Sequence, residues 1–368
     1  MGGMSIIPFA NKHAYNLVAY QPGKPIEETA REIGMAPEDI VKLASNENPF
    51  GPSPRAVEAM AKAAAGTHIY PDGASFSLRS RLAELFGVDF NQTAVGSGSS
   101  ELIELLAHSF LNPGTETVAA DYSFTLYNIV SKLSNATYVS VPNKADWSHD
   151  LQGILNAVTP HTRLVFITNP TNPVGTMVFQ EELDAFMAAV PDHVVVVFDE
   201  AYIDFAEEKP DTLKYLKQGK NVAILRTFSK AYGLAGARVG FALTTPEIAD
   251  LLNKTRSPFN VNLMAQAGAL AALEDTEHVA RGVEQIKLGR KLYEDTFKAW
   301  GIDYVPSHTN FILAKVGNGQ QCFRDCLQQG VILRSMAPYG LYEYIRITIG
   351  TTAENKRCLE VLANVLGK

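Results

Sequence analysis

Short runs of uninterrupted apolar and β-branched residues recur through the middle of the chain, and they constrain its fold most strongly. Examples are Arg163–Thr168, Val194–Phe198 and Ala223–Thr227. A strand that is apolar on both faces has to be covered on both faces, which is typical of parallel sheets between layers of helices. Segments with helical spacing, such as Gln180–Ala189, alternate with these runs. The sequence therefore predicts an α/β fold with a large doubly wound, mainly parallel sheet.

The pattern changes near both ends of the chain. The first stretch has scattered proline and glycine and little periodicity, which indicates an arm lying on another part of the molecule. After Ser257-Pro258 a long helical region, about Val261 to Ala299, precedes strand-like segments at Phe311–Lys315 and Tyr344–Thr348. We therefore predict an N-terminal arm and start of a small domain (1–50), a large domain (51–257) and a smaller C-terminal α+β domain (258–368).

Composition excludes several classes of function. The 39 acidic residues outnumber the 32 basic ones, and a net charge of −7 argues against nucleic acid or an anionic membrane as partner. No apolar run has the length needed to span a bilayer, and no secretory leader is recognisable at the start. Three cysteines without CxxC spacing argue against a disulfide scaffold or a zinc site. We expect a cytoplasmic protein without a metal site.

Polar side chains follow directly after three of the predicted strands. They are Asn172 after the first, Asp199 and Tyr202 after the second, and Ser229 and Lys230 after the third, with Arg238 in the next loop. In open α/β sheets, ligands bind in the crevice outside the carboxyl ends of the strands. We therefore expect these side chains to converge on one pocket.

This set of side chains suits pyridoxal phosphate. That cofactor needs a lysine to hold its aldehyde as a Schiff base and an acid facing its pyridine nitrogen. Lys230 is the candidate lysine and catalytic residue, and Asp199 is the candidate acid. A charge pair at about 4 Å is worth roughly 4 kcal/mol at an effective dielectric near 20, enough to keep the ring nitrogen protonated. Asn172 and Tyr202 are expected to hydrogen-bond the ring oxygen and so lower the pKa of the imine.

The phosphate of the cofactor needs a separate set of donors. Gly98-Ser99-Ser100 at a predicted helix start offers backbone N–H groups, two hydroxyls and the positive end of the helix dipole. Ser229 and Arg238 complete this predicted seat, since arginine pairs with phosphate through two parallel hydrogen bonds. Phe124, on another strand-end loop, is expected to stack on the cofactor ring.

At this point the residues resemble a known family. Asn172-Pro-Val-Gly, Asp199-Glu-Ala-Tyr202, Ser229-Lys230 and Arg238 are similar to the signature of fold-type I, class I/II aminotransferases. More narrowly, the chain resembles the histidinol-phosphate aminotransferases along its length. This resemblance is carried by the motifs Ser45-Asn-Glu-Asn-Pro-Phe-Gly51, Tyr70-Pro-Asp-Gly73, Gly96-Ser-Gly-Ser-Ser-Glu-Leu-Ile103, Thr227-Phe-Ser-Lys-Ala-Tyr-Gly-Leu-Ala-Gly236, Leu333-Arg334 and Ile345-Arg-Ile-Thr-Ile-Gly-Thr351.

The resemblance implies a homodimer with active sites at the interface, where Tyr70 would reach the cofactor phosphate of the neighbouring subunit. Tyr20 and the arm would help to close over substrate. Arg346 would bind the carboxylate of glutamate, with Asn172 also on the substrate side, and Arg334 with Tyr20 would hold the phosphate end of histidinol phosphate. The implied reaction interconverts histidinol phosphate and 2-oxoglutarate with imidazole-acetol phosphate and glutamate, a step of histidine biosynthesis.

Two positions depart from the family pattern. Many members have tyrosine where this chain has Phe124, and aspartate or glutamine where it has Ser100. At both positions the chain is similar to bacterial relatives that also accept aromatic amino acids. An aromatic amino acid aminotransferase therefore stays open as an alternative. A phosphothreonine decarboxylase also stays open, because it has the same fold and acts on another phosphorylated substrate.

Overall fold

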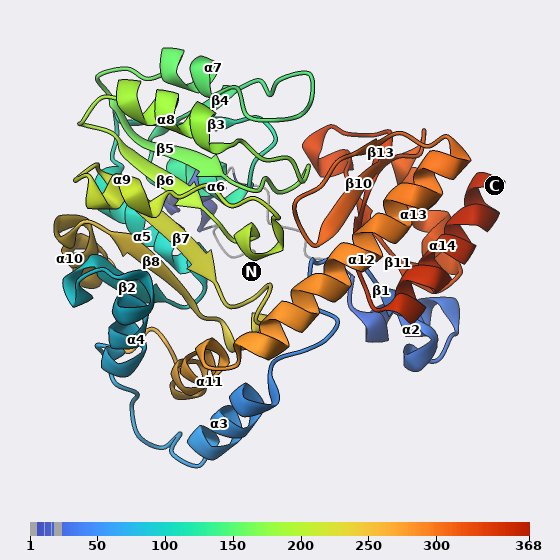
Figure 1. Cartoon of the computed structure of the whole chain (residues 1–368). Coiled ribbons are helices and arrows are strands. Elements are labelled where there is room, and N and C mark those ends of the chain that lie inside the picture. Colours follow the sequence, from blue (N-terminus) through green and yellow to red (C-terminus); the bar gives the residue numbers. More distant parts are fainter. Residues whose placement is uncertain (1–5, 11, 16, 18–23) are drawn as a thin grey trace, which may run out of the picture.

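The structure, a computed structural model, describes residues 6–10, 12–15, 17 and 24–368. Figure 1 shows two units side by side: a large sheet with its helices, and a smaller unit of helices and strands built mainly from the C-terminal part of the chain. The 25-residue helix α12 (Thr276–Trp300) runs from the edge of the first unit along the second.

The large sheet has seven strands in the order β2-β8-β7-β6-β5-β3-β4. Their bounds are β2 (Thr93–Gly96), β8 (Gly240–Thr244), β7 (Val222–Thr227), β6 (Val195–Asp199), β5 (Thr162–Thr168), β3 (Glu116–Ala120) and β4 (Thr137–Val141). Neighbouring strands are parallel except for β8, which is antiparallel to both β7 and β2. The predicted fold class, a mainly parallel α/β sheet, is confirmed.

The central strands are apolar throughout because each one contributes to two separate cores. On β6, Val196 and Phe198 face one hydrophobic cluster, whereas Val195 and Val197 face the other. Successive side chains of a strand point to opposite faces, so a strand between two helical layers has to be apolar at every position. The same alternation explains the run on β5.

Helices cover both faces of this sheet. Buried residues of α5 (Ser99–Phe110), α6 (Leu126–Leu133) and α10 (Pro246–Thr255) pack in the cluster on one face. The other face is covered by α4 (Phe76–Phe86), α7 (Leu151–Asn156), α8 (Gln180–Ala189), α9 (Leu213–Lys217) and α11 (Leu263–Leu273). The helix α3 (Pro54–Ala64) packs against α11, and its N-terminus is capped by Ser53, whose side chain accepts from the Ala56 backbone N–H.

The smaller unit holds a four-stranded sheet in the order β12-β13-β10-β9 and a parallel pair, β1 with β11. Its elements are β1 (Val41–Lys42), β9 (Tyr304–Val305), β10 (Phe311–Lys315), β11 (Val331–Ile332), β12 (Arg334–Ser335), β13 (Tyr344–Thr348), α2 (Ile26–Ile33), α12, α13 (Gly319–Gln328) and α14 (Thr352–Leu366). The pairing of β1 with β11 joins residues before the large sheet to this C-terminal unit.

The predicted long helical region is divided into α11 and α12. The division falls at Asp275, whose side chain accepts from the backbone N–H of His278 and so caps α12. Residues of α11 belong to the hydrophobic cluster of the large sheet. The domain boundary at residue 257 stays a prediction, and the helix that follows it packs with the large unit.

The described residues include no helix that is long and apolar enough to cross a membrane. All three cysteines are buried and free, although the sulfur atoms of Cys322 and Cys326 lie 4.0 Å apart. The expected cytoplasmic location stays a prediction.

His149 is a fully buried histidine that links two loops of the large unit. Its Nε2 lies 3.2 Å from Thr171 Oγ1, in the loop that follows β5. Burial lowers its pKa from 6.5 to about 4. The folded protein therefore keeps this imidazole neutral at pH values where the unfolded chain would protonate it.

The unfolding free energy is expected to decrease as the pH falls from 6.5 towards 4, because the unfolded chain takes up a proton at His149 first. The decrease attributable to this residue amounts to at most about 3 kcal/mol. Urea denaturation at a series of pH values measures it, and His149→Gln should flatten this part of the profile. The same substitution at the exposed His161 is the control. Equal slopes for the wild type and His149→Gln would contradict the assignment.

Candidate active site

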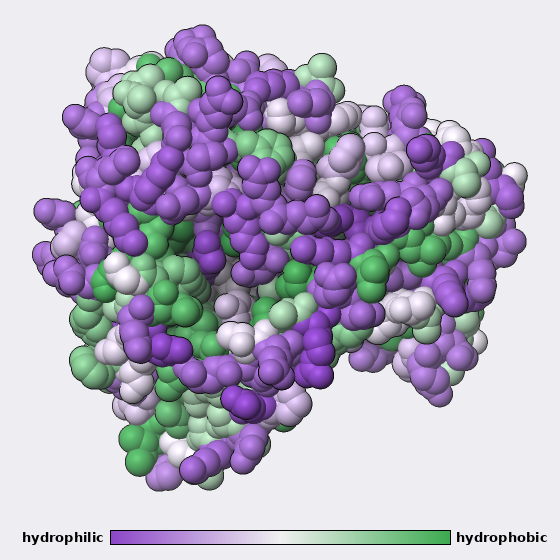
Figure 2. Space-filling view, in the orientation of Figure 1, coloured by the Kyte–Doolittle hydropathy of each residue, from purple (hydrophilic) through white to green (hydrophobic). Residues whose placement is uncertain are grey.

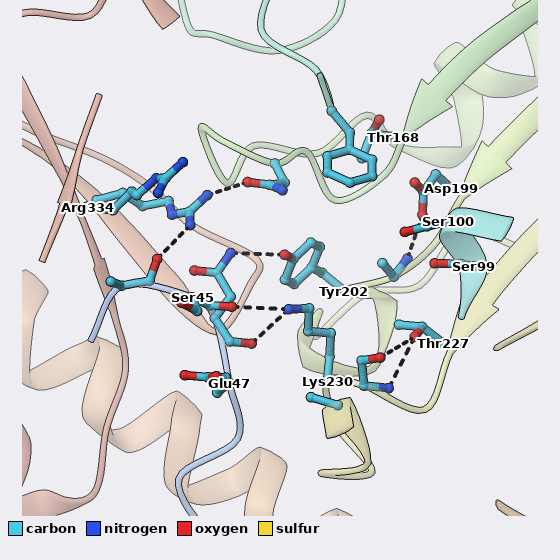
Figure 3. Close-up of a pocket in the computed structure, with 18 of the residues that line it drawn as sticks. Ser45, Glu47, Ser99, Ser100, Thr168, Asp199, Tyr202, Thr227, Lys230 and Arg334 are labelled. Atoms are coloured by element: carbon cyan, nitrogen blue, oxygen red, sulfur yellow. Dashed lines mark hydrogen bonds between the residues drawn. The ribbon is translucent and has the colours of Figure 1, made fainter. Parts of the chain in front are cut away.

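A cavity of about 270 Å³ opens at the carboxyl edge of β5, β6 and β7, between the two units. Most of the residues singled out from the sequence line it. They are Ser99, Ser100, Phe124, Asn172, Asp199, Tyr202, Ser229, Lys230, Arg238, Arg334 and Arg346. Figure 3 shows Arg334 on one side of the cavity, Asp199 on the other and Lys230 rising between them.

The antiparallel strand β8 helps to gather these side chains. Because β8 runs opposite to its neighbours, its first residue, Gly240, lies beside Thr227 at the carboxyl end of β7. Gly240 also pairs with Gly96, the last residue of β2. The start of α5 and Arg238, two residues before β8, are therefore brought to the same edge as the ends of the parallel strands.

The start of α5 forms a compact cradle with Arg238. Gly98 has φ +83°, and a Cβ added to it would lie 2.4 Å from a guanidinium nitrogen of Arg238. A Cβ on Gly240 would lie 2.5 Å from the backbone nitrogen of Ser99. Only glycine fits these two positions. Arg238 Nη1 also donates to Ser229 Oγ at 3.4 Å. Hydroxyls, a guanidinium and a helix N-terminus thus meet in one place, which suits an anion such as phosphate.

Asp199 is a carboxylate at the end of a fully buried strand. Its Oδ2 accepts from the Tyr127 hydroxyl at 2.7 Å, and its Oδ1 accepts from the Ala201 backbone N–H at 3.2 Å. Burial raises its pKa above the ordinary value. The neighbouring Glu200 pairs with Arg226, whereas Asp199 forms no ion pair within the part of the chain that the structure describes. A buried carboxylate that lines a cavity in this way fits a ligand with a positively charged ring nitrogen.

Tyr127 is a residue of this site that the sequence did not single out. It is completely buried, its ring stacks on Phe166 with centroids 4.1 Å apart, and its hydroxyl also lies 2.8 Å from Thr168 Oγ1. Phe124 packs edge-on against it at 5.8 Å. Burial raises the pKa of the Tyr127 phenol well above its usual value, so the hydroxyl stays a donor to Asp199.

The segment before α3, which contains Asn46 and Asn48, is hydrogen-bonded to Lys230. The lysine Nζ donates to the backbone oxygen of Asn46 at 3.0 Å, and Asn48 Nδ2 donates to the backbone oxygens of Lys230 and Ala231 at 3.2 and 3.0 Å. Asn46 Nδ2 also donates to the Tyr202 hydroxyl at 2.9 Å. The sequence marked this segment only through its resemblance to the family, without a role for Asn46.

Two arginines lie at the end of the cavity formed by the smaller unit. The register of β12 and β13 places Arg334 directly opposite Arg346. The guanidinium of Arg346 donates to Asn172 Oδ1 at 2.6 Å and to the Ala44 backbone oxygen at 3.2 Å, and it lies 5.0 Å from the ring centroid of Phe311. Like charges on directly opposed positions repel, so this end of the cavity favours an anionic ligand.

Of the other predicted residues, Tyr70 does not line this cavity, and Tyr20 cannot be placed relative to it. Tyr70 lies outside it, 78% exposed, with its ring stacked on Phe259 at 4.6 Å. Tyr20 lies outside the described residues.

Comparison with known families identifies the architecture. Residues 38–362 match the family described as aminotransferase class I and II. The chain belongs to this family. It is 62% identical to a histidinol-phosphate aminotransferase of Akkermansia muciniphila, over 99% of this chain and 100% of that protein. It is 46% identical to histidinol-phosphate aminotransferase 2 of Pseudomonas fluorescens, over 98% of each chain. The resemblance read from the sequence motifs is therefore confirmed.

Solved structures agree with this grouping. The histidinol-phosphate aminotransferase of Sinorhizobium meliloti, solved in complex with pyridoxal 5′-phosphate, superposes with a TM-score of 0.88. The two chains are 29% identical, and the match covers 97% of each. The aminotransferase fold thus extends over nearly the whole of this chain.

Removing the Tyr127 hydroxyl tests how Asp199 is stabilised. Tyr127→Phe should lower the unfolding free energy at neutral pH by about 2 kcal/mol, because a buried carboxylate loses a hydrogen-bond donor. Urea denaturation measures the change. Tyr215→Phe is the matched control, since its hydroxyl donates at 2.6 Å to Asp184, whose side chain is 45% exposed and can be rehydrated. Equal losses in the two variants would argue against a special role for Tyr127.

Proposed function

We propose that this chain is a pyridoxal-phosphate-dependent transaminase that interconverts histidinol phosphate and 2-oxoglutarate with imidazole-acetol phosphate and glutamate. The observation that carries the proposal is the placement of Lys230 between a phosphate-type cradle, the buried Asp199 and a pair of arginines. The names of the similar proteins support the substrate, and the cofactor bound to the Sinorhizobium meliloti enzyme supports the cofactor.

Different residues of the cavity would bind different parts of the cofactor. Ser99, Ser100, Ser229 and Arg238 would hold its phosphate, with the N-terminus of α5. Asp199 would face its ring nitrogen, while Asn172 and Tyr202 would hold its ring oxygen and Phe124 would cover one face of the ring. When bound, pyridoxal phosphate supplies an aldehyde that forms a C=N bond with amines and a ring that accepts the electron pair of a broken Cα–H bond.

Lys230 has two tasks in this proposal. Its Nζ would hold the cofactor covalently until the amino donor takes its place. Once released, the amine would be a general base that takes the proton from the α-carbon of the donor and delivers it to the C4′ carbon of the cofactor. The neighbouring carbonyl oxygen of Asn46, 3.0 Å from Nζ, can hold the free amine in place between these steps.

The substrates would be held at the arginine end. Arg346 would bind the α-carboxylate of glutamate through its planar guanidinium, in place of or beside the amide of Asn172. Arg334, directly opposite, would bind the phosphate of histidinol phosphate. Tyr20 is proposed to approach the same phosphate from the N-terminal arm. Because one positive end serves two anionic substrates in turn, it suits a reaction of two half-reactions.

We further propose a homodimer in which Tyr70 reaches the cofactor phosphate of the neighbouring subunit. Figure 2 shows hydrophobic side chains on the surface at the lower left, where α3, α4 and α11 lie in Figure 1. The exposed large apolar residues of this region include Val57, Ile69, Tyr70, Phe76, Leu85, Phe259 and Met264. Contiguous exposed apolar surface of this kind marks an interaction site. Sedimentation as a monomer at micromolar concentration would contradict the dimer.

Lys230→Ala should reduce transamination at least about a thousandfold, because both the covalent seat and the general base are lost. The visible absorbance of the enzyme with bound cofactor should also shift to that of unlinked pyridoxal phosphate. Lys217→Ala, an exposed lysine at the end of α9, is the control and should change neither property. Retention of both activity and absorbance in Lys230→Ala would show that the assignment is wrong.

Arg334→Gln tests the proposed binding of the histidinol phosphate phosphate group, and hence the identity of the substrate. It should lower kcat/KM for histidinol phosphate by about ten- to a hundredfold, since a charge-assisted hydrogen bond is lost, and change kcat/KM for phenylalanine much less. Steady-state kinetics with both amino donors measures the two effects. A wild-type preference for phenylalanine would favour an aromatic aminotransferase, and carbon dioxide release from phosphothreonine would favour a decarboxylase.

A further inference from the structure

Asn46 is a buried asparagine on the loop between β1 and α3, only 2% exposed, with φ +55°. We propose that Asn46 is a positioning residue: it fixes the direction of the Tyr202 hydroxyl, so that Tyr202 donates its proton into the cavity. The proposal rests on the function proposed above, and it assigns to Asn46 a role that acts through Tyr202.

The direction follows from the chemistry of the two groups. The contact joins Asn46 Nδ2 to the Tyr202 hydroxyl oxygen at 2.9 Å. An amide nitrogen can only donate, so the phenol oxygen accepts this bond and its own proton points elsewhere. In the described part of the chain Tyr202 has no second hydrogen-bond partner, and its side chain lines the cavity. Its proton is therefore available to a bound ligand.

Thr348, the last residue of β13, holds the amide of Asn46 in this orientation. The backbone N–H of Asn46 donates to Thr348 Oγ1 at 2.9 Å, and the Thr348 hydroxyl donates to Asn46 Oδ1 at 3.2 Å. The amide oxygen is thus satisfied by Thr348, which leaves the amide nitrogen facing Tyr202. Asn310 Nδ2 adds a bond to the backbone oxygen of Asn46 at 3.1 Å and fixes the left-handed turn.

Tyr202 itself is suited to remain a donor. It is 4% exposed, its ring packs edge-on against Phe311 at 5.4 Å, and burial raises the pKa of its phenol. A protonated phenol that donates to the ring oxygen of the cofactor stabilises negative charge on that oxygen. This lowers the proton affinity of the C=N nitrogen at Lys230. The nitrogen can then be unprotonated at neutral pH, which is the form that an incoming amine needs for attack.

Asn46→Asp is the sharpest variant because it is nearly isosteric and reverses the polarity of the contact. A carboxylate at position 46 accepts the Tyr202 proton, which the cofactor oxygen then loses. The proton affinity of the Lys230 C=N nitrogen should rise about tenfold, corresponding to one pKa unit. Asn46→Gly keeps the left-handed backbone and removes the amide, so the hydroxyl can rotate and a smaller rise is expected.

The negative charge of the new aspartate would by itself raise the same proton affinity, so the effect has to be separated from it. Combining Asn46→Asp with Tyr202→Phe closes a double-mutant cycle. If the carboxylate acts by capturing the Tyr202 proton, its effect should largely disappear in the Tyr202→Phe background. A purely electrostatic effect would persist there unchanged.

The measurement is a spectrophotometric pH titration of the enzyme loaded with pyridoxal phosphate, with cofactor content and melting temperature recorded for every variant. The proposal is overturned if Asn46→Asp changes the pKa of the C=N nitrogen equally with Tyr202 and with Phe at position 202. It is also overturned if Asn46→Asp titrates like the wild type. If that variant does not fold, an unchanged titration in Asn46→Gly overturns it alone. Failure of the wild type to bind pyridoxal phosphate at all would instead refute the proposed function.

Discussion

A carboxylate at the end of a fully apolar strand is costly to bury, and Asp199 occupies such a position at the centre of the large sheet. Two donors make it tolerable: the Tyr127 hydroxyl and the Ala201 backbone N–H. Neither neutralises its charge. Among the described residues no cationic side chain pairs with it, so a ligand with a protonated pyridine ring fits this end of the cavity.

The topology of the sheet places the remaining groups around this carboxylate. Parallel strands deliver Asn172 and Lys230 to the same edge because their carboxyl ends coincide. The single reversed strand, β8, delivers the loop with Arg238 to that edge as well, and its Gly240 lets the start of α5 approach closely. The groups suited to a phosphate and the groups suited to a cofactor ring therefore line the same cavity although they are far apart in the sequence.

The sequence predicted the sheet and most of the cavity because both depend on local signals: strand-length apolar runs and the polar residues that directly follow them. It did not predict the role of Tyr127, since helical periodicity shows only that this side chain is buried, not which polar group it meets. Asn46 lies in a loop without periodicity, and its partners Tyr202 and Thr348 are 156 and 302 residues away. The five-residue helix α9 was also missed, because one turn carries too little pattern.

Strand β13 connects the two ends of the cavity. Arg346 and Thr348 are two residues apart and so lie on the same face of the strand. Arg346 lies at the arginine end of the cavity, and Thr348 is hydrogen-bonded to Asn46. Arg346 is directly opposed by Arg334 in the register of β12 and β13, so two positively charged side chains lie at this end of the cavity. An anion bound at this end would therefore contact the same strand that holds Asn46 through Thr348. One strand thus carries both the arginine proposed to bind the substrate carboxylate and the threonine that holds Asn46.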